Sequence, residues 1–156
     1  VDGVGFEKYF SILDKLEIFN AIKTDNDLKP VKNKNTFSVL GFSRCNNFVG
    51  KNILPTEQIN ENNITAKREL YNTNIKILDD IRNDYHIFLS KVDLENDLDE
   101  AIHDRLSTLL CVDEPVEYLQ KFKHYNMVEL VGKLSDEDCA TIYNHYNFAC
   151  LKEVSE

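Results

Sequence analysis

Two pairs of acidic side chains, each with one residue between its members, are the features of this sequence best suited to chemistry. Asp25 and Asp27 form the first pair, and Asp93 and Glu95 repeat the spacing. Carboxylates gathered in one place repel one another and raise each other's pKa, and bound cations relieve that repulsion. Ligands that offer only oxygen favour magnesium, manganese or calcium over zinc. We therefore expect a metal site whose carboxylates lie on the order of 5–8 Å apart.

Each acidic pair follows a short, mostly apolar run that predicts a buried strand. Residues 18–22 form the first run and residues 85–89 the second. Such runs are typical of strands in a parallel sheet, and ligands of these sheets bind just past the carboxyl ends of the strands. The order helix, strand, helix, strand, helices predicts an α/β fold with a parallel sheet flanked by helices. Both acidic pairs are therefore expected at one edge of the sheet.

Helical periodicity predicts the elements that flank this sheet. Residues 6–16 and 66–84 each carry an apolar face, and residues 36–49 are compatible with a helix that contains Gly41. Residues 29–35 and 55–63 are polar and predict loops.

The remainder of the chain, after the second acidic pair, is expected to be helical. An apolar stripe runs from Leu98 to Leu109, and Pro115 suits the first turn of a helix that extends to Lys123. Ser135 is expected to cap a further helix.

The acids also have a structural interpretation that the spacing leaves open. Aspartate is common in loops, and an acidic pair after a strand often caps the next helix. Asp97 fits this interpretation best, because an acid in the first turn of a helix is stabilised by the helix dipole.

Composition narrows the class of protein. Of the 156 residues, 42% are hydrophobic and 29% charged, which is ordinary for a globular domain. The net charge of −9 argues against a stand-alone DNA-coating module, because phosphate binding draws on Lys and Arg. No apolar run approaches the length of a membrane span, so no membrane association is expected.

The ends and the cysteines point to a cytoplasmic chain. No basic-then-apolar leader opens the sequence, and it begins with Val1, which we interpret as a fragment or a processed piece. The four cysteines form no C-x-x-C pair, and we expect all of them to be buried, reduced thiols: Cys45, Cys111, Cys139 and Cys150.

Both acid-bearing stretches resemble parts of one nuclease family. Residues 22–28 (IKTDNDL) are similar to the D-x-D strand end of Toprim domains, and residues 89–98 (LSKVDLENDL) to the second acidic cluster of the OLD (overcoming lysogenization defect) family nucleases. Further stretches resemble the nuclease subunits of the Gabija anti-phage defence system, namely GFSRCN (41–46), DEPVEYLQK (113–121), NMVELV (126–131) and FACLKE (148–153). The ordered set covers nearly the whole chain.

The resemblance implies a metal-dependent DNA endonuclease with a two-metal site. Asp25 and Asp27 would bind one magnesium ion (or manganese or calcium), and Asp93 and Glu95 would help to hold the second. Asp25 and Asp93 are then also the catalytic acids. Two such ions can activate a water and stabilise the leaving oxygen of a phosphodiester.

A lysine downstream of the acids is also part of the family's site, and two residues of this sequence match it. Lys123 is our choice over Lys121, and its ammonium would neutralise charge that develops on the phosphorane. If the segment is one helix, the two side chains point about 200° apart and only one can face the acids.

The resemblance also implies partners and a domain plan. We expect a Toprim catalytic core over residues 1–112 that lacks its first strand, and a helical subregion of the same domain over residues 113–156. In the family, an ATPase domain precedes this part and mediates homo-oligomer assembly, and a UvrD-like helicase subunit acts with the nuclease on double-stranded DNA. The family's first-strand glutamate has no match here, so the isolated chain is expected to cleave poorly.

Two other functions remain open at this stage. The chain could be a non-catalytic protein-interaction module with a degenerate Toprim fold, in which the acids are structural. A different Toprim activity, such as a primase or topoisomerase, is a weaker hypothesis, because the similarity beyond the acids is to the nuclease.

Overall fold

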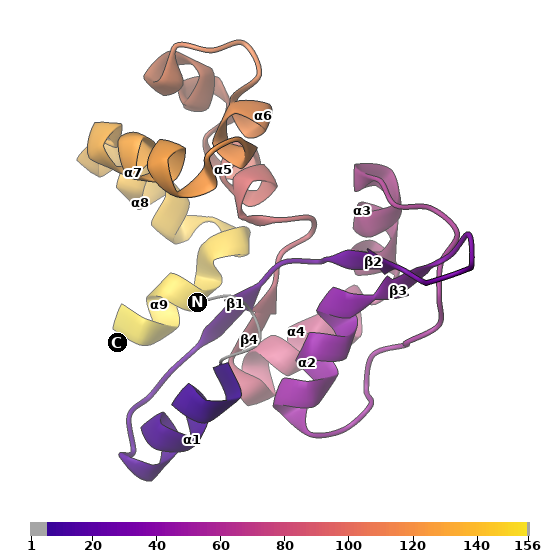
Figure 1. The fold of residues 1–156 in the computed structure, drawn as a ribbon. Helices are drawn as coiled ribbons and strands as arrows, with labels where there is room; N and C mark the ends of the chain where they lie inside the picture. Colours follow the sequence, from indigo (N-terminus) through magenta and orange to yellow (C-terminus); the bar gives the residue numbers. More distant parts are fainter. Residues whose placement is uncertain (1–5, 156) are drawn as a thin grey trace.

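The helices and strands follow one another in an α/β order around a short parallel sheet (Figure 1). The computed structural model describes residues 6–155. The N-terminal part contains α1 (Phe6–Lys15), β1 (Ile22–Thr24), β2 (Leu28–Pro30), β3 (Phe37–Val39), α2 (Leu40–Val49), α3 (Ile64–Thr73), α4 (Ile75–Tyr85) and β4 (Ile87–Leu89). The C-terminal part contains α5 (Leu94–Leu110), α6 (Pro115–Gln120), α7 (Lys123–Lys133), α8 (Asp136–Asn144), the 3-10 turn η1 (Tyr146–Phe148) and α9 (Ala149–Ser155).

β1 and β4 pair in parallel, with Ile22 opposite Ile87 and Thr24 opposite Leu89. Both strands therefore end at the same edge of the sheet, and the predicted α/β fold with a parallel sheet flanked by helices is confirmed. The first strand was expected over residues 18–22 and that placement is wrong. Ile18 and Phe19 are about half exposed, and the strand begins only at Ile22, because the partner strand is three residues long.

The segment around residues 28–39 is an antiparallel hairpin, where the sequence predicts a loop and the start of a helix. Leu28 pairs with Val39, and Val31 N–H donates to the Thr36 carbonyl across the turn. Pro30 is tolerated there because the hairpin has only two strands, so a proline can lie on an unpaired edge. The predicted helix over residues 36–49 is thereby shortened to α2.

The helix expected over residues 66–84 is two helices, α3 and α4, that meet at Asn74. The Asn74 side chain donates to the Leu70 carbonyl, a local bond that competes with the regular helix ladder. The predicted apolar face persists across the break, with Tyr71, Leu78 and Ile81 all buried. α4 ends at His86, whose left-handed backbone (φ 57°) turns the chain directly into β4.

The C-terminal part is helical, as predicted. Asp93 caps α5, Pro115 opens α6, and Ser135 forms a reciprocal capping box with Asp138 at the start of α8. The helix expected from Pro115 to Lys123 ends at Gln120 instead, and Lys123 is the first residue of α7. α5 is interrupted at Ile102, whose φ of −134° and ψ of 38° lie outside the helical region.

Buried apolar side chains form two clusters. One joins β1, β4, α2, α3 and α4, and the other joins α5 to α6, α7, α8 and η1. The proposed division at residue 112 stays a prediction, and α5, which precedes that residue, packs in the second cluster.

The four cysteines are free thiols, but only Cys45 and Cys150 are buried. Cys111 and Cys139 are exposed, so the prediction that all four are buried is wrong. Cys111 ends α5 in a left-handed conformation, and Cys139 lies on the outer face of α8, so apolar neighbours in sequence do not bury them. Within residues 6–155, no helix is long and apolar enough to cross a membrane.

Candidate active site

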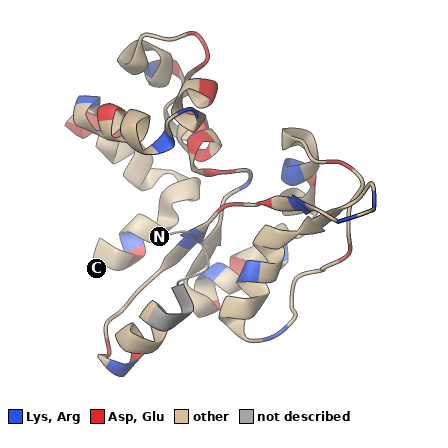
Figure 2. Ribbon diagram, in the orientation of Figure 1, with Lys and Arg blue, Asp and Glu red and all other residues tan. Residues whose placement is uncertain are grey.

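The carboxyl ends of β1 and β4 open into two short segments that carry the acidic pairs (Figure 2). The Asn26 side chain joins these segments. It is fully buried, and its Nδ2 donates to the carbonyls of Lys67 and Lys91, each at 3.0 Å. Its backbone N–H donates to the Val92 carbonyl. Asn26 therefore fixes Asp25 close to Asp93 although neither segment is a strand at this point.

Gly41 allows the backbone of the first acidic segment to lie against the start of α2. Its N–H donates to the Asp27 carbonyl at 3.0 Å. A Cβ atom at residue 41 would lie 2.7 Å from the Asp25 carbonyl oxygen and 2.9 Å from the Asn26 Cα. Both are backbone atoms, so a larger residue would displace the segment that carries Asp25.

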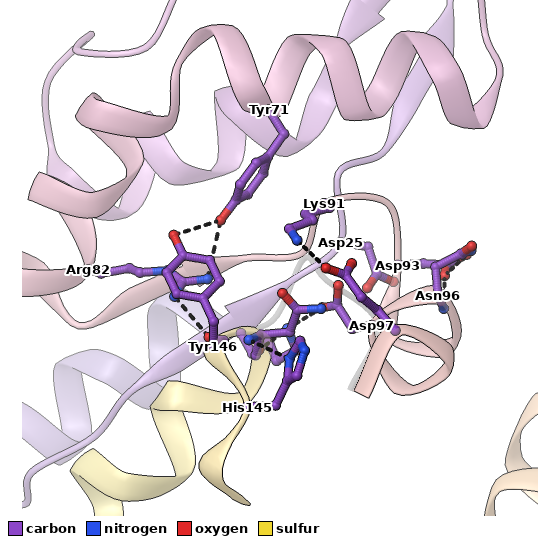
Figure 3. A network of polar contacts seen from close by, with 12 residues as sticks. Asp25, Tyr71, Arg82, Lys91, Asp93, Asn96, Asp97, His145 and Tyr146 are labelled. Atoms are coloured by element: carbon purple, nitrogen blue, oxygen red, sulfur yellow. Dashed lines mark hydrogen bonds and ion pairs between the residues drawn. The ribbon is translucent and has the colours of Figure 1, made fainter. Parts of the chain in front are cut away.

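The second acidic segment forms the N-terminus of α5. Asp93 Oδ1 accepts hydrogen bonds from the backbone N–H and the side chain of Asn96. Asp93 Oδ2 accepts a hydrogen bond from Gln120 Nε2 at 2.8 Å, which ties α6 to the site. Figure 3 shows Asp25 and Asp93 side by side next to this helix start, and each charge acts on the other.

Lys123 lies between the two acidic segments. Its Nζ is 3.0 Å from Glu95 Oε1 and 3.8 Å from Asp25 Oδ2, so the two carboxylate oxygens are separated by less than the sum of these distances. Glu95 is fully buried, and its Oε1 faces the Lys123 ammonium. Lys123 therefore brings positive charge to both carboxylates, and Lys23 adds to it at Asp25.

The surroundings raise the pKa of two acids in this cluster, Asp25 and Glu95, and so favour their neutral forms. Burial raises the pKa of Asp25, and Asp27 and Asp93 raise it further against the opposing effect of Lys123. Burial likewise raises the pKa of Glu95, partly offset by a backbone hydrogen bond and by Lys123. Burial would lower the pKa of Lys123, but Glu95, Asp25 and Asp93 outweigh it and raise that pKa. Burial thus outweighs the lysine in setting the pKa of both acids.

Asp27 has a different partner from the rest of the cluster. Its Oδ2 lies 2.6 Å from Arg44 Nη1 in a partly exposed ion pair. Among the described residues, no three His, Cys, Asp or Glu side chains converge closely enough to be recognised as a metal site. The donor chemistry nevertheless fits a hard divalent cation, because Lys123 faces only Oε1 of the buried Glu95 carboxylate and the ligand atoms around the lysine are all oxygens.

The two candidate lysines are separated by the turn between α6 and α7. Lys121 lies outside both helices and pairs with Glu117 at 2.6 Å, whereas Lys123 reaches the acids. The expectation that one helix carries both is wrong, because Phe122 adopts a left-handed conformation and breaks it. The expected outcome, that only one of the two faces the acids, holds for this different reason.

Asp97 lies in the first turn of α5, as predicted, and it has a structural partner that the sequence did not indicate. It is buried and lies 2.5 Å from the Nζ of Lys23, which also donates to the Asn147 carbonyl. This ion pair connects β1 to α5 and η1, directly behind the acidic cluster.

A second polar connection behind the site was missed in the sequence. Arg82 lies 3.9 Å from the centre of the Tyr146 ring and donates to the Tyr146 carbonyl and the Tyr71 hydroxyl (Figure 3). The Tyr146 hydroxyl in turn donates to Asp79 at 2.6 Å. These contacts hold η1 against α3 and α4 and so join the two apolar clusters.

Gly41, Asn26 and Gln120 also position the site and were missed as site residues in the sequence. The asparagine between the two aspartates was the one available signal, since a polar residue directly after a buried strand needs partners. Gln120 gave no signal, because its contact with Asp93 depends on how α6 packs.

Comparison with known proteins identifies one relevant relative. No protein-family profile matches the sequence. The chain is similar to the protein named endonuclease GajA from Bacillus cereus (strain VD045), with 39% identity over 165 residues. The similarity covers 99% of this chain but 28% of that relative, so the chain spans less than a third of its length. The resemblance to the Gabija nuclease subunits that the sequence motifs indicate is thereby confirmed.

Proposed function

We propose that this chain is the Toprim-type catalytic part of a metal-dependent DNA endonuclease that acts in bacterial anti-phage defence, in the cytoplasm, as Gabija nucleases do. One observation carries the proposal. Lys123 lies between Asp25 and Glu95 at the carboxyl end of a parallel sheet, in a chain similar over 99% of its length to a protein named as an endonuclease.

The four acids would hold two divalent metal ions, with magnesium preferred and manganese or calcium as substitutes. They are Asp25, Asp27, Asp93 and Glu95. When bound, such ions supply an activated water and stabilise the leaving oxygen of the phosphodiester. The raised pKa values of Asp25 and Glu95 support this role, because both carboxylates gain from additional positive charge.

Other residues of this chain would orient the acids and neutralise negative charge on the phosphate. Lys123 would balance negative charge on the phosphate under attack, an interaction that grows as the transition state forms. Gln120 holds one oxygen of Asp93 and leaves the carboxylate in a fixed direction. Asn26 keeps Asp25 in place through buried hydrogen bonds, so the site is organised before DNA arrives.

Assembly and partners are part of the proposal. Because the relative is much longer than this chain, we infer an ATPase domain elsewhere in the natural protein, a homo-oligomer built through it, and a UvrD-like helicase partner. The substrate is double-stranded DNA. A glutamate supplied from outside the 156 residues would complete the site, so the isolated chain should nick DNA poorly.

The test uses the natural, full-length protein with supercoiled plasmid and magnesium. Asp25→Asn combined with Glu95→Gln should abolish nicking, and Asp136→Asn, an exposed acid on α8, should not. Calorimetry should show that magnesium or manganese binding is lost in the same double variant. Unchanged nicking by the double variant would overturn the proposal.

A non-catalytic interaction module is the alternative function, and one observation favours it. Two of the four acids already have structural partners, since Asp27 pairs with Arg44 and Asp93 caps α5. This alternative predicts no metal binding and no nicking by the wild-type full-length protein, whereas the nuclease proposal predicts both.

A further inference from the structure

Two exposed aromatic rings lie at the start of α7, next to the lysine of the candidate site. Phe122 is 85% exposed, the most of any large hydrophobic side chain that the structure describes, and Tyr125 is 76% exposed. Phe122 directly precedes Lys123, whose ammonium reaches Glu95 and Asp25. The rings are therefore anchored one and two residues from the group that contacts the acids.

The backbone of Phe122 is held in a conformation that a residue with a side chain avoids. Its φ and ψ are both 47°, in the left-handed region. Asn126 stabilises this turn, because its buried Nδ2 donates to the carbonyls of Tyr118 and Lys121, while its N–H donates to the Phe122 carbonyl. A strained and well-supported residue next to a reactive cluster is the pattern found at functional sites.

Phe122 and Tyr125 lie at the site end of a row of exposed apolar side chains on α7. Val128 is 73% exposed and Val131 61% exposed, and together with the two rings they recur every third residue. Phe122 and Tyr125 differ from the two valines in being aromatic and in flanking Lys123, so the valines serve to separate contacts at the site from contacts along the whole helix.

The position of the rings beside Lys123 favours a nucleic-acid strand over a protein, because DNA is the substrate proposed for that site. Residues 118–128 contain no Asp or Glu, although Lys121 pairs with Glu117, and Lys123 pairs with Glu95 and Asp25. Cations attract phosphates, and flat apolar rings attract the faces of bases without regard to sequence. Phe122 offers no hydrogen bond, so it can recognise only the face of a base.

We propose that Phe122 and Tyr125 form a platform on which an unstacked base of the DNA strand rests beside the phosphate that is cut. The proposal rests on the nuclease function above and names the part of the substrate that the chain touches. Bases inside a regular duplex already stack on one another, so the platform serves DNA that is opened or distorted at the cut. Holding that base places the neighbouring phosphate at Lys123.

The first experiment measures cleavage by the full-length protein with the variants Phe122→Asn, Phe122→Trp and Tyr125→Ala. Asparagine accepts the left-handed backbone and removes the ring, so folding should be unchanged by thermal melting. KM for DNA should rise about tenfold or more in Phe122→Asn, with kcat nearly unchanged, given the strength of base–aromatic stacking. Phe122→Trp should retain the wild-type KM, and Val131→Ala serves as the matched control on the same helix.

The second experiment asks which base rests on the platform. Nucleotides around the mapped cut are replaced one at a time by abasic sites. At one position the wild-type KM should rise, and at that position Phe122→Asn should show no further rise. If no abasic site affects the wild type, or if Val131→Ala is as damaging as Phe122→Asn, the surface binds a protein and the platform is wrong.

These results also separate this inference from the proposed function. If the wild type cuts DNA, Asp25→Asn does not, and Phe122→Asn keeps its KM, then only the platform is overturned. If Asp25→Asn cuts as fast as the wild type, the nuclease site itself is overturned, and the platform with it.

Discussion

The ammonium group of Lys123 lies 3.0 Å from a carboxylate oxygen of Glu95, a residue completely shielded from solvent. Glu95 stands in the first turn of α5 and Lys123 is the first residue of α7, so the contact joins the beginnings of two helices. Glu95 is shielded from solvent, whereas the Lys123 side chain is 45% exposed, so the pair is open to solvent on the side of the lysine. Under the proposed function, the substrate phosphate approaches the pair from the exposed side of the lysine.

Replacement of Lys123 by alanine should slow DNA cleavage by the full-length protein on the order of 100- to 1000-fold, because one electrostatic donor to the transition state is lost. DNA binding should be nearly unchanged, since the interaction forms mainly as the reaction proceeds. Gel-shift binding and plasmid nicking measured side by side test this. Lys121→Ala is the control, because Lys121 pairs with Glu117, and its turnover should be near normal. Normal cutting by Lys123→Ala would mean that no lysine here is catalytic.

Glu95→Gln should stabilise the metal-free protein at neutral pH. Because burial raises the pKa of Glu95 above 4.5, the folded state binds its proton more tightly than the unfolded state. The free energy of unfolding contributed by this group is therefore highest below the unfolded pKa and falls as pH rises toward the folded pKa. Glutamine cannot ionise and avoids that loss. In EDTA, the variant should melt at a higher temperature than the wild type at pH 7 and at a similar temperature at pH 4.

The opposite result for Glu95→Gln would be equally informative. A wild-type protein that is more stable than the variant at pH 7 in EDTA would mean that the ion pair with Lys123 outweighs the cost of burying the carboxylate.

Gly41→Ala should destabilise the protein by about 1–3 kcal/mol, because its Cβ would press on backbone atoms of Asp25 and Asn26 that cannot rotate away. The displaced Asp25 should also lower nicking. Gly132→Ala is the matched control, since nothing lies within 4 Å of a Cβ there, and it should stabilise α7 by up to about 1 kcal/mol. Chemical denaturation of both variants measures the difference, and equal stabilities would contradict the close approach at residue 41.

Asn26→Ala should cost about 1–3 kcal/mol, because the carbonyls of Lys67 and Lys91 lose their shared buried donor. Nicking should fall as well, since Asp25 and Asp93 lose the side chain that ties their segments together. Asn144→Ala removes a comparable bond, to the Ala140 carbonyl, on the exposed surface of α8 and should be nearly neutral. Thermal melting of the two variants measures the loss of stability, and nicking measures whether the Asn26 hydrogen bonds also keep Asp25 in position.

The sequence was sufficient to predict which acids follow the two strands, because acids that follow buried runs leave a parallel sheet at one edge. Asp25, Asp93, Glu95 and Lys123 were named from the sequence and its resemblance, and the structure brings them into one electrostatic cluster. Asp27 was also named, but it pairs with Arg44, whose position on α2 depends on the hairpin that precedes that helix. The sequence shows no pattern that predicts this hairpin, because β2 and β3 have only three residues each and are too short for a clear alternation of apolar and polar residues.

Errors at element boundaries have a common physical origin. The first strand was placed too early because Ile18 and Phe19 are apolar, yet the register with β4 decides which residues pair, and that depends on distant residues. The α6–α7 break was missed because Phe122 gives no sign of a left-handed turn. It is stabilised by the Asn126 side chain, a contact that arises only once both helices are formed.

The interruption of α5 at Ile102 has a mechanical consequence. The N-terminal half of α5 carries Glu95, and both halves pack in the cluster that contains α6 and α7, the helix that begins with Lys123. A helix bends most easily where its ladder is already interrupted. The separation of the Lys123 ammonium and the Glu95 carboxylate therefore depends on the angle that α5 keeps at Ile102.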